Sequence, residues 1–499
     1  MPQGLDTAAE ASTAASGDRS ARPRRSGDRR AVLRRFDWAL VGRIGLWVTI
    51  PVAGATWVGT TISQRYPVYD DWVIIDRATS GSWLREMFIG FNGHLWSLAY
   101  WAYHLQVNVL GLESNWFLPL LLVASLVALQ LGVAAVLSRL GLPTVVALLA
   151  ATVVTYFGPG SETMVFQLSL GGNFALALTF AAAYVALGKR HDRRTAIVVA
   201  AIAVAALFCD SALAVAGFLF LIVMVTYLWP FRLALVALVP PAVAHAAWYA
   251  LDHSEVLIRG TCQNCRSVTF GASFGGRVDF GWAIFVRSAG GLVGGSVTAG
   301  EIFLGVAVAV ACIGLAMRRL SRPVVASLVG GTLAAVAAVA LISYTRAGFW
   351  RSIHVAIANL DGPGNRYLQP AAVFLMIAFI PAMAAAIRPS RRMVSWVVTA
   401  IASAGLIVVF AVNLSSLRPT RVLYEGLSYS VKSDVRQAVA VITAGCAPGE
   451  HLARKARPIN ASFQITVGLL ERLIDRGALT AKFGRPAQPA LRTRICRPT

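Results

Sequence analysis

Charged residues are scarce in this 499-residue chain, and acidic residues are scarcer than basic ones. Asp, Glu, Lys and Arg together make up 14% of the sequence, whereas a soluble globular protein carries about 25%. Hydrophobic residues make up 57%. The composition therefore excludes a soluble globular protein and predicts a polytopic membrane protein.

Two features that would indicate other functions are also missing. The sequence has no glycine-rich loop of the kind that cradles nucleotide phosphates, so we expect no nucleotide-sugar site. The formal net charge is +22, but Lys and Arg occur in short clusters between apolar runs, without a contiguous basic face. This distribution is typical of the cytoplasmic loops of membrane proteins, and we expect no nucleic-acid partner.

Apolar runs divide the chain into three parts: a basic segment of residues 1–36, a membrane domain of residues 37–413 and a tail of residues 414–499. The first part lacks apolar periodicity, so we expect it to be disordered. About eleven runs approach the length of roughly 20 residues that crosses a bilayer. These runs are 38–62, 116–137, 143–158, 165–187, 195–211, 213–229, 233–251, 301–317, 324–343, 366–387 and 394–413. The sequence thus predicts an all-α polytopic membrane protein with about eleven transmembrane helices.

The charges of the loops predict the orientation in the cell membrane. Short basic loops alternate with long loops, and basic loops face the cytoplasm. The N-terminus is therefore expected in the cytoplasm and the C-terminus outside it. The long outer segments are then 63–115, 252–300, 344–365 and 414–499. Aromatic residues in the first of these predict interfacial helices, and apolar periodicity in the last predicts a small α-rich extracytoplasmic domain.

An adjacent pair of acids, Asp70 and Asp71, follows the first apolar run. Two like charges side by side repel, which raises the pKa of at least one of them. Acids with a shifted pKa at a membrane surface are candidates for catalysis, so we single out both as catalytic candidates. The alternative is a helix cap or a solvated turn after Pro67.

Three further polar residues lie in predicted outer loops or at their edges. His94 is a candidate to bind a phosphate or orient an acid, or else an ordinary interfacial histidine. Glu162 is a candidate to join the acid pair, or a solvated turn acid. Asp210 lies in a tight connection between two apolar runs, where we expect it to cap a helix, the alternative being to line a cavity.

Basic residues gather before the tenth apolar run. Arg346 and Arg351 lie in the predicted loop, and Arg366 and Tyr367 open the next span. Arginine there can pair with a lipid phosphate through two hydrogen bonds. The alternative is that Arg and Tyr anchor the helix in the interface. We favour phosphate binding.

The six cysteines differ by location. Cys446 and Cys496 flank much of the tail on the expected oxidising side, where a disulfide is plausible. Cys262 and Cys265 form a lone CxxC pair in an outer loop. No second ligand pair at zinc-finger spacing follows, so we expect a disulfide and not a zinc site.

The chain resembles the GT-C class of membrane glycosyltransferases. The resemblance is carried by Asp70-Asp71-Trp72 after the first span, Asn92-Gly93-His94 some twenty residues later, and Asn365-Arg366-Tyr367 before a late helix. These three short motifs are similar to motifs of the bacterial glucosyltransferase and arabinofuranosyltransferase branches of the class. The resemblance covers topology over most of residues 38–413 and does not reach the tail.

The resemblance implies inverting transfer of a sugar from a polyprenyl-phosphate donor to a glycan, lipid or protein acceptor outside the cytoplasm. One of Asp70 and Asp71 would act as the general base on the acceptor hydroxyl. Arg366, with Arg351 or Arg346, would neutralise the phosphate that leaves. Some members of the class bind a divalent metal near the acids. The sequence offers no ligand set at a diagnostic spacing, so it leaves metal use open.

Two other functions compete with this interpretation. A polysaccharide polymerase or ligase would use arginines in late outer loops, and Arg346, Arg351 and Arg366 fit it, but the early acid pair does not. A flippase or transporter for lipid-linked sugars predicts charges within the spans and internal repeats. The predicted spans carry few charges, mostly towards their ends, and no repeat is evident.

Overall fold

The computed structural model describes residues 38–62, 65–80, 82–90, 94–252, 273–352, 366–387, 392–447, 450–452, 458–460 and 465–498. The chain divides into two compact units, Met1–Gly45 and Leu46–Thr499. In the first unit, the described residues form the start of a helix. The packing described below is that of the second unit.

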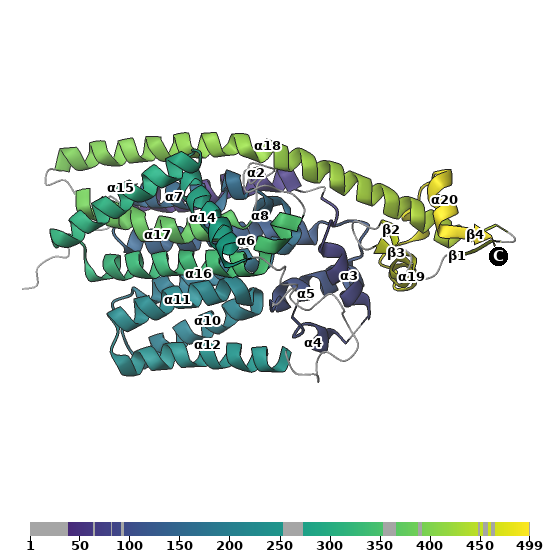
Figure 1. Ribbon diagram of the computed structural model, residues 1–499, viewed down its shortest axis with the longest axis horizontal. Helices are drawn as coiled ribbons and strands as arrows, with labels where there is room; N and C mark the ends of the chain where they lie inside the picture. The colour runs from purple at the N-terminus through teal and green to yellow at the C-terminus, as the bar shows by residue number, and fades with distance from the viewer. Residues whose placement is uncertain are drawn as a thin grey trace, which may run out of the picture. The chain divides into compact units, whose positions relative to one another are not determined.

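Helices make up most of the described chain (Figure 1). Those up to residue 252 are α2 Trp38–Ile62, α3 Asp71–Ser80, α4 Trp83–Glu86, α5 Ser97–Leu105, α6 Phe117–Arg139, α7 Thr144–Thr155, α8 Glu162–Val165, α9 Leu170–Ala186, α10 Arg193–Cys209, α11 Ser211–Leu228 and α12 Phe231–Asp252. The later ones are α14 Phe274–Gly291, α15 Val297–Ala316, α16 Arg322–Ser352, α17 Leu368–Ile387, α18 Arg392–Ala444, α19 Val467–Asp475 and α20 Pro489–Ile495.

Nine helices among the described residues are long enough and apolar enough to cross a membrane. The prediction of an all-α membrane protein therefore agrees with the structure. The expected number was about eleven. The difference lies in α7, which has 12 residues, and α10, which has 17. At 1.5 Å per residue they are shorter than the roughly 30 Å hydrocarbon core.

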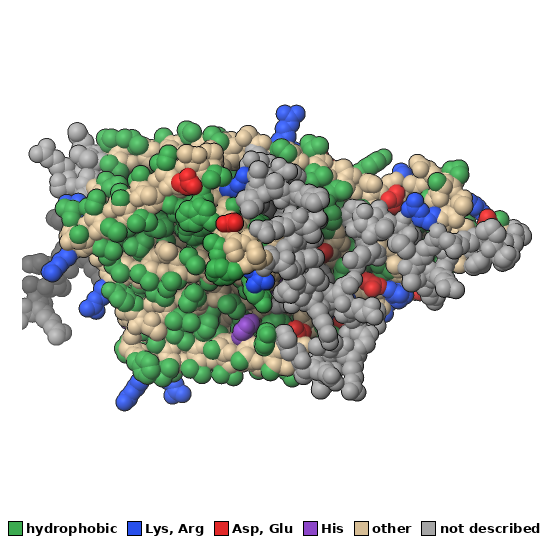
Figure 2. Space-filling view, in the orientation of Figure 1, with side chains coloured by type: hydrophobic (Ala, Val, Ile, Leu, Met, Phe, Trp, Pro, Cys, Tyr) green, Lys and Arg blue, Asp and Glu red, His purple; other side chains and the backbone are tan. Residues whose placement is uncertain are grey.

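The bundle has a continuous apolar core. In it α6 packs against α9, and α16 packs against α11 and α17. Hydrophobic side chains also cover much of the visible face of the bundle (Figure 2), as expected of a surface that meets lipid. Close helix contacts use glycine: a Cβ on Gly300 of α15 would clash with the carbonyl oxygen of Val286 and lie 2.7 Å from the backbone nitrogen of Gly290, both on α14. Small residues at such crossings let two backbones approach closely.

Two helices occupy segments that the sequence analysis assigned to outer loops. α14 lies within the expected loop 252–300, and its buried Phe280 and Ile284 contribute to the bundle core. α16 continues to Ser352, so Arg346 lies on a helix and not in a loop. α14 was missed because glycines and charged residues interrupt its apolar pattern.

α18 is a single helix of 53 residues, about 80 Å long. The expected end of the last span at residue 413 falls inside it. Because a bilayer core is only about 30 Å thick, much of α18 extends beyond a membrane. In Figure 1 it runs from the bundle to the C-terminal elements.

The tail contains short strands besides its helices. Strand β1 Glu450–Leu452 pairs antiparallel with β4 Cys496–Pro498, with His451 opposite Arg497. Strand β2 Pro458–Asn460 pairs antiparallel with β3 Ile465–Thr466. The prediction of an α-rich tail did not include these two small sheets.

A second apolar core joins the segment between α2 and α6 to the tail. Trp72 of α3 and Tyr103 of α5 are buried in it together with Val435 of α18 and Leu470 of α19. The segment expected to carry interfacial helices forms α3, α4 and α5, and Trp72 of α3 and Tyr103 of α5 pack against protein. This core fixes the position of α3, which starts at the acid pair.

Candidate functional site

Residues 65–68, which precede the acid pair, are buried and held by other elements. The carbonyl oxygen of Arg65 accepts a hydrogen bond from Asn115 Nδ2 at 2.9 Å. The backbone N–H of Tyr66 donates to Ser428 Oγ of α18 at 2.6 Å. The acid pair is thus attached to a segment whose position depends on α18, far away in the sequence.

The turn before the acid pair has an unusual backbone. Tyr69 has φ 52°, in the left-handed region that residues with a Cβ seldom adopt. The turn is closed by a hydrogen bond from Trp72 Nε1 to the carbonyl oxygen of Pro67 at 2.9 Å. Such backbone strain persists where surrounding structure enforces it, and it is common at functional sites.

The Asp71 carboxylate is enclosed, with only 1% of the residue exposed. One of its oxygens accepts a hydrogen bond from the Tyr103 hydroxyl, and the other accepts from the backbone N–H of Val68 at 2.8 Å. Burial raises the pKa of Asp71 to about 7, although both hydrogen bonds act to lower it. The sequence prediction of an acid with a raised pKa applies to this residue, and its main cause is burial and not repulsion from Asp70.

The Asp70 side chain has different surroundings. It is 36% exposed, and its Oδ2 lies 3.9 Å from Nη2 of Arg366. The two acids therefore differ: the Asp71 carboxylate is enclosed, whereas the Asp70 carboxylate is accessible to a substrate-sized molecule.

Arg366 is the centre of a polar cluster. Its Nη1 lies 3.3 Å from Glu162 Oε1, and its backbone N–H donates to Glu162 Oε2 at 3.2 Å. The guanidinium also lies over the Phe166 ring, 4.5 Å from the centroid. The Tyr424 hydroxyl donates to Glu162 Oε1 at 2.6 Å. These contacts hold the guanidinium in one orientation beside Asp70.

Glu162 is positioned by the chain just before it. Ser161 Oγ and Thr420 Oγ1 of α18 share a hydrogen bond of 2.7 Å. Gly160 packs so closely that a Cβ there would lie 3.1 Å from the Cβ of Gln369 on α17. α8, α17 and α18 therefore meet at the cluster.

A cavity of about 110 Å³ reaches the cluster from within the bundle. His94, Asp210, Arg346, Arg366 and Tyr367 contribute to its lining, and most of the remaining lining is apolar. Five residues from distant parts of the sequence thus share one cavity. Asp70 and Glu162 contact Arg366 but do not line this cavity.

His94 and Asp210 form a pair at one wall of the cavity. His94 Nδ1 lies 3.3 Å from Asp210 Oδ1. The same Asp210 oxygen accepts from the backbone N–H groups of Ala212 at 3.0 Å and Leu213 at 3.2 Å, so Asp210 caps α11. Both interpretations of Asp210, as a cap and as a cavity residue, therefore apply.

The described residues around Asp70 do not fit a divalent cation. The Arg366 guanidinium lies 3.9 Å from Oδ2 of Asp70 and competes with a metal ion for the carboxylate. In the described part of the chain, the one group of three or more potential ligands is Cys446, Glu450 and Cys496, and there the two sulfurs bond to each other. We therefore derive no step through a metal.

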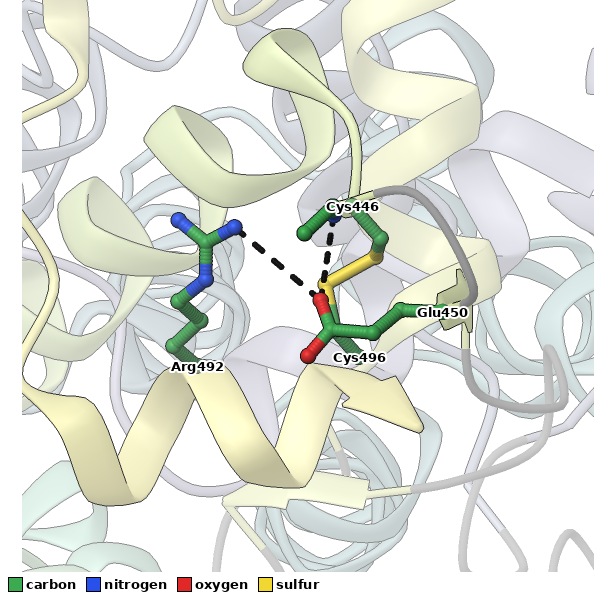
Figure 3. Close-up of a disulfide and its surroundings, with 5 residues drawn as sticks. Cys446, Glu450, Arg492 and Cys496 are labelled. Atoms are coloured by element: carbon green, nitrogen blue, oxygen red, sulfur yellow. Dashed lines mark hydrogen bonds and ion pairs between the residues drawn. A yellow bond between two sulfur atoms is a disulfide. The ribbon is translucent and has the colours of Figure 1, made fainter. Parts of the chain in front are cut away.

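Cys446 and Cys496 form a disulfide that ties the end of α18 to β4 (Figure 3). Beside it, Glu450 accepts a hydrogen bond from the Ala447 N–H at 3.0 Å and lies 4.0 Å from Arg492. Cys262 and Cys265 lie outside the described residues, and so does the side chain of Arg351.

Sequence reasoning missed two tyrosines that complete the site. Tyr103 holds Asp71, and Tyr424 holds Glu162. Tyr103 lies in the aromatic-rich stretch after the acid pair, but that pattern gave no reason to prefer it to its neighbours. Tyr424 lies in the tail, and no local signal connects it with residue 162.

Comparison with known proteins gives no family for this chain: no family model matches it, and no significant match is found among characterised proteins or solved structures.

Proposed function

We propose that the protein is a membrane glycosyltransferase of the GT-C type that moves a sugar from a polyprenyl-phosphate donor to an acceptor on the extracytoplasmic face. The observation that supports it most is the contact of an accessible carboxylate, Asp70, with a clamped guanidinium, Arg366, at 3.9 Å. Glycosyl transfer from a lipid phosphate needs a base and a cation close together.

In this proposal Asp70 is the general base. The acceptor hydroxyl oxygen forms a bond to the anomeric carbon of the sugar, and its proton passes to the Asp70 carboxylate. The bond between that carbon and the phosphate oxygen breaks, and the polyprenyl phosphate leaves with the electron pair. A single displacement of this kind inverts the anomeric configuration.

Arg366 neutralises the charge that grows on the leaving phosphate. Its contacts with Glu162 and Phe166 fix the guanidinium before the substrate arrives, so little reorganisation is needed during the reaction. Arg346 and His94 line the adjoining cavity and are candidates for further contacts with the phosphate. The mostly apolar lining fits the first part of a prenyl chain.

Asp71 is a positioning residue in this scheme. Both its oxygens are engaged and it is enclosed, so it does not meet a substrate. It holds the turn on which Asp70 lies.

The test is a transfer assay in membranes that contain the protein, supplied with a series of radiolabelled polyprenyl-phosphate sugars. The proposal predicts that label moves from one of these donors into a glycan, lipid or protein fraction, and that heat-inactivated membranes show no transfer. Movement of the intact lipid-linked sugar across the bilayer without cleavage would contradict it and favour a flippase.

A further inference from the structure

A second polar cavity lies away from Arg366, between the ends of α2 and α6 and the middle of α18. Its volume is about 890 Å³. Thr61 from α2, Trp116 next to α6, and Arg421 and Lys432 from α18 contribute to its lining. We call it the Arg65 cavity, after the buried arginine among its lining residues.

The charges of the cavity favour an anion. Arg65, Arg421, Lys432 and Arg436 face two acids, Glu113 and Glu425, in the lining. Both acids are engaged: Glu113 accepts a hydrogen bond from the Thr480 N–H at 2.6 Å, and Glu425 accepts from Arg421 at 2.7 Å. Lys432 lies over the Tyr66 ring, 5.8 Å from the centroid, and has no carboxylate partner among the described residues.

Buried polar groups in the same wall point to a missing ligand. The Arg65 side chain is 4% exposed, and its Nε and Nη1 have no hydrogen-bond partner in the described structure. The hydroxyl of buried Tyr66 is also without one. Unsatisfied groups of this kind are expensive, and folded proteins seldom leave several together without a reason. An oxyanion in the cavity would accept hydrogen bonds from the Arg65 guanidinium and the Tyr66 hydroxyl once these side chains, whose unpaired atoms are enclosed in the packing described, turn towards it.

The position of the cavity indicates where the anion comes from. Thr61 lies at the end of a membrane-spanning helix, and half-exposed Trp116 lies just before the start of another. Tryptophan at a helix end is typical of the headgroup region. α18 is too long to lie within the bilayer, and its part from Arg421 onward lines the cavity.

We propose that the Arg65 cavity binds the phosphate group of an anionic molecule at the membrane surface, at a site distinct from the Arg366 cluster. The shared chemistry is a phosphate with free oxygens, supplied by a lipid headgroup or by phosphate in solution. The site is independent of the proposed glycosyl transfer, because none of the contacts described for the Arg366 cluster involves its basic residues.

The experiment uses the full-length protein in phosphatidylcholine nanodiscs and follows the thermal unfolding midpoint. One arm replaces part of the lipid with phosphatidylglycerol, and the other adds inorganic phosphate. A ligand at tenfold excess over its Kd raises the midpoint by about 2 °C. A gain with phosphatidylglycerol alone identifies the lipid headgroup, and a gain with inorganic phosphate as well shows that the phosphate group suffices.

Three variants locate the effect. Lys432→Gln should lose most of the gain. Arg418→Gln should keep it, because Arg418 is exposed on the same helix and does not line the cavity. Tyr66→Phe should match or exceed wild type without the probe, since it removes an unsatisfied hydroxyl, and should gain less than wild type with it.

The proposal is overturned if neither probe raises the midpoint of the wild type, or if Arg418→Gln and Lys432→Gln lose the gain equally. It is also overturned if Tyr66→Phe is destabilised to the same extent with and without the probes, because its hydroxyl would then have a structural partner.

Discussion

Asp70 Oδ2 lies 3.9 Å from Arg366 Nη2, although the two residues belong to distant parts of the sequence. Both sides of the contact are attached to α18. Ser428 of α18 holds the turn before α3, and Thr420 and Tyr424 hold the chain around Glu162, which in turn binds Arg366. α18 therefore has a structural role in the site even though it contributes neither member of the pair.

The buried carboxylate of Asp71 should make stability depend on pH. Its pKa in the folded state is about 7, against an ordinary value of 3.8. The folded protein therefore holds this proton more tightly than the unfolded chain does. Stability from this group is fully present below about pH 4 and is lost as pH rises through 7, a change on the order of 4 kcal/mol.

Thermal unfolding between pH 5 and 8 tests this effect. The midpoint of the wild type should fall with rising pH, and the midpoint of Asp71→Asn, which cannot titrate, should depend less on pH in the same range. Parallel curves for the two proteins would refute a raised pKa at this position.

Arg366 should contribute more to the binding of the donor than to the binding of the acceptor. Arg366→Lys keeps a charge but loses the forked contact geometry, so we expect about a tenfold loss in kcat, and about a hundredfold loss for Arg366→Ala. In both variants the KM of the donor should rise and the KM of the acceptor should change little. Exposed Arg418→Ala is the control. Equal rises in the KM of the donor and the KM of the acceptor would argue against a phosphate role for Arg366.

Gly300 should be essential for the contact of α15 with α14. Gly300→Ala places a methyl group against the backbone of Val286 and Gly290, which should destabilise the protein by about 1–3 kcal/mol. Gly305→Ala on the same helix meets nothing within 4 Å and is the matched control. Thermal unfolding in detergent measures both, and equal stability of the two variants would show that the helices do not approach as described.

The disulfide should stabilise the tail. Cys446 and Cys496 are separated by 50 residues, and closing a loop of that size is worth about 4 kcal/mol in the chain-entropy treatment. Cys446→Ser should make residues 447–498 more sensitive to proteolysis, and so should reduction of the wild type. Cys312→Ser, at a free and exposed cysteine, should leave the pattern unchanged.

Several parts of this structure could be predicted from the sequence, because each depends on a local pattern. Long apolar runs predicted most of the helices that are long and apolar enough to cross a membrane. The acid pair and the Arg366-Tyr367 motif predicted residues that lie close together in the structure. The segments of α7 and α10 were counted as spans on their hydrophobicity, although both apolar runs are shorter than the roughly 20 residues that cross a bilayer.

The rest depends on contacts between distant segments. Nothing near Asp70 or Asp71 indicates which carboxylate is enclosed, since that is decided by Tyr103 of α5 and by the second apolar core. The polar groups of the Arg65 cavity come from the end of α2 and the residues after it, from the segment just before α6 and from α18, and they have no common motif. α14 was missed because a helix buried on one face needs only a few apolar residues.

The most direct test of the proposed mechanism compares Asp70→Asn with Asp71→Asn in the transfer assay, with thermal unfolding measured on the same preparations. We predict that Asp70→Asn abolishes transfer without lowering the unfolding midpoint, because its side chain is 36% exposed and its ion pair with Arg366 is long, at 3.9 Å. Asp71→Asn should lower activity chiefly by disturbing the turn, with an altered midpoint. Undiminished transfer by Asp70→Asn would contradict the assignment of this carboxylate as the base.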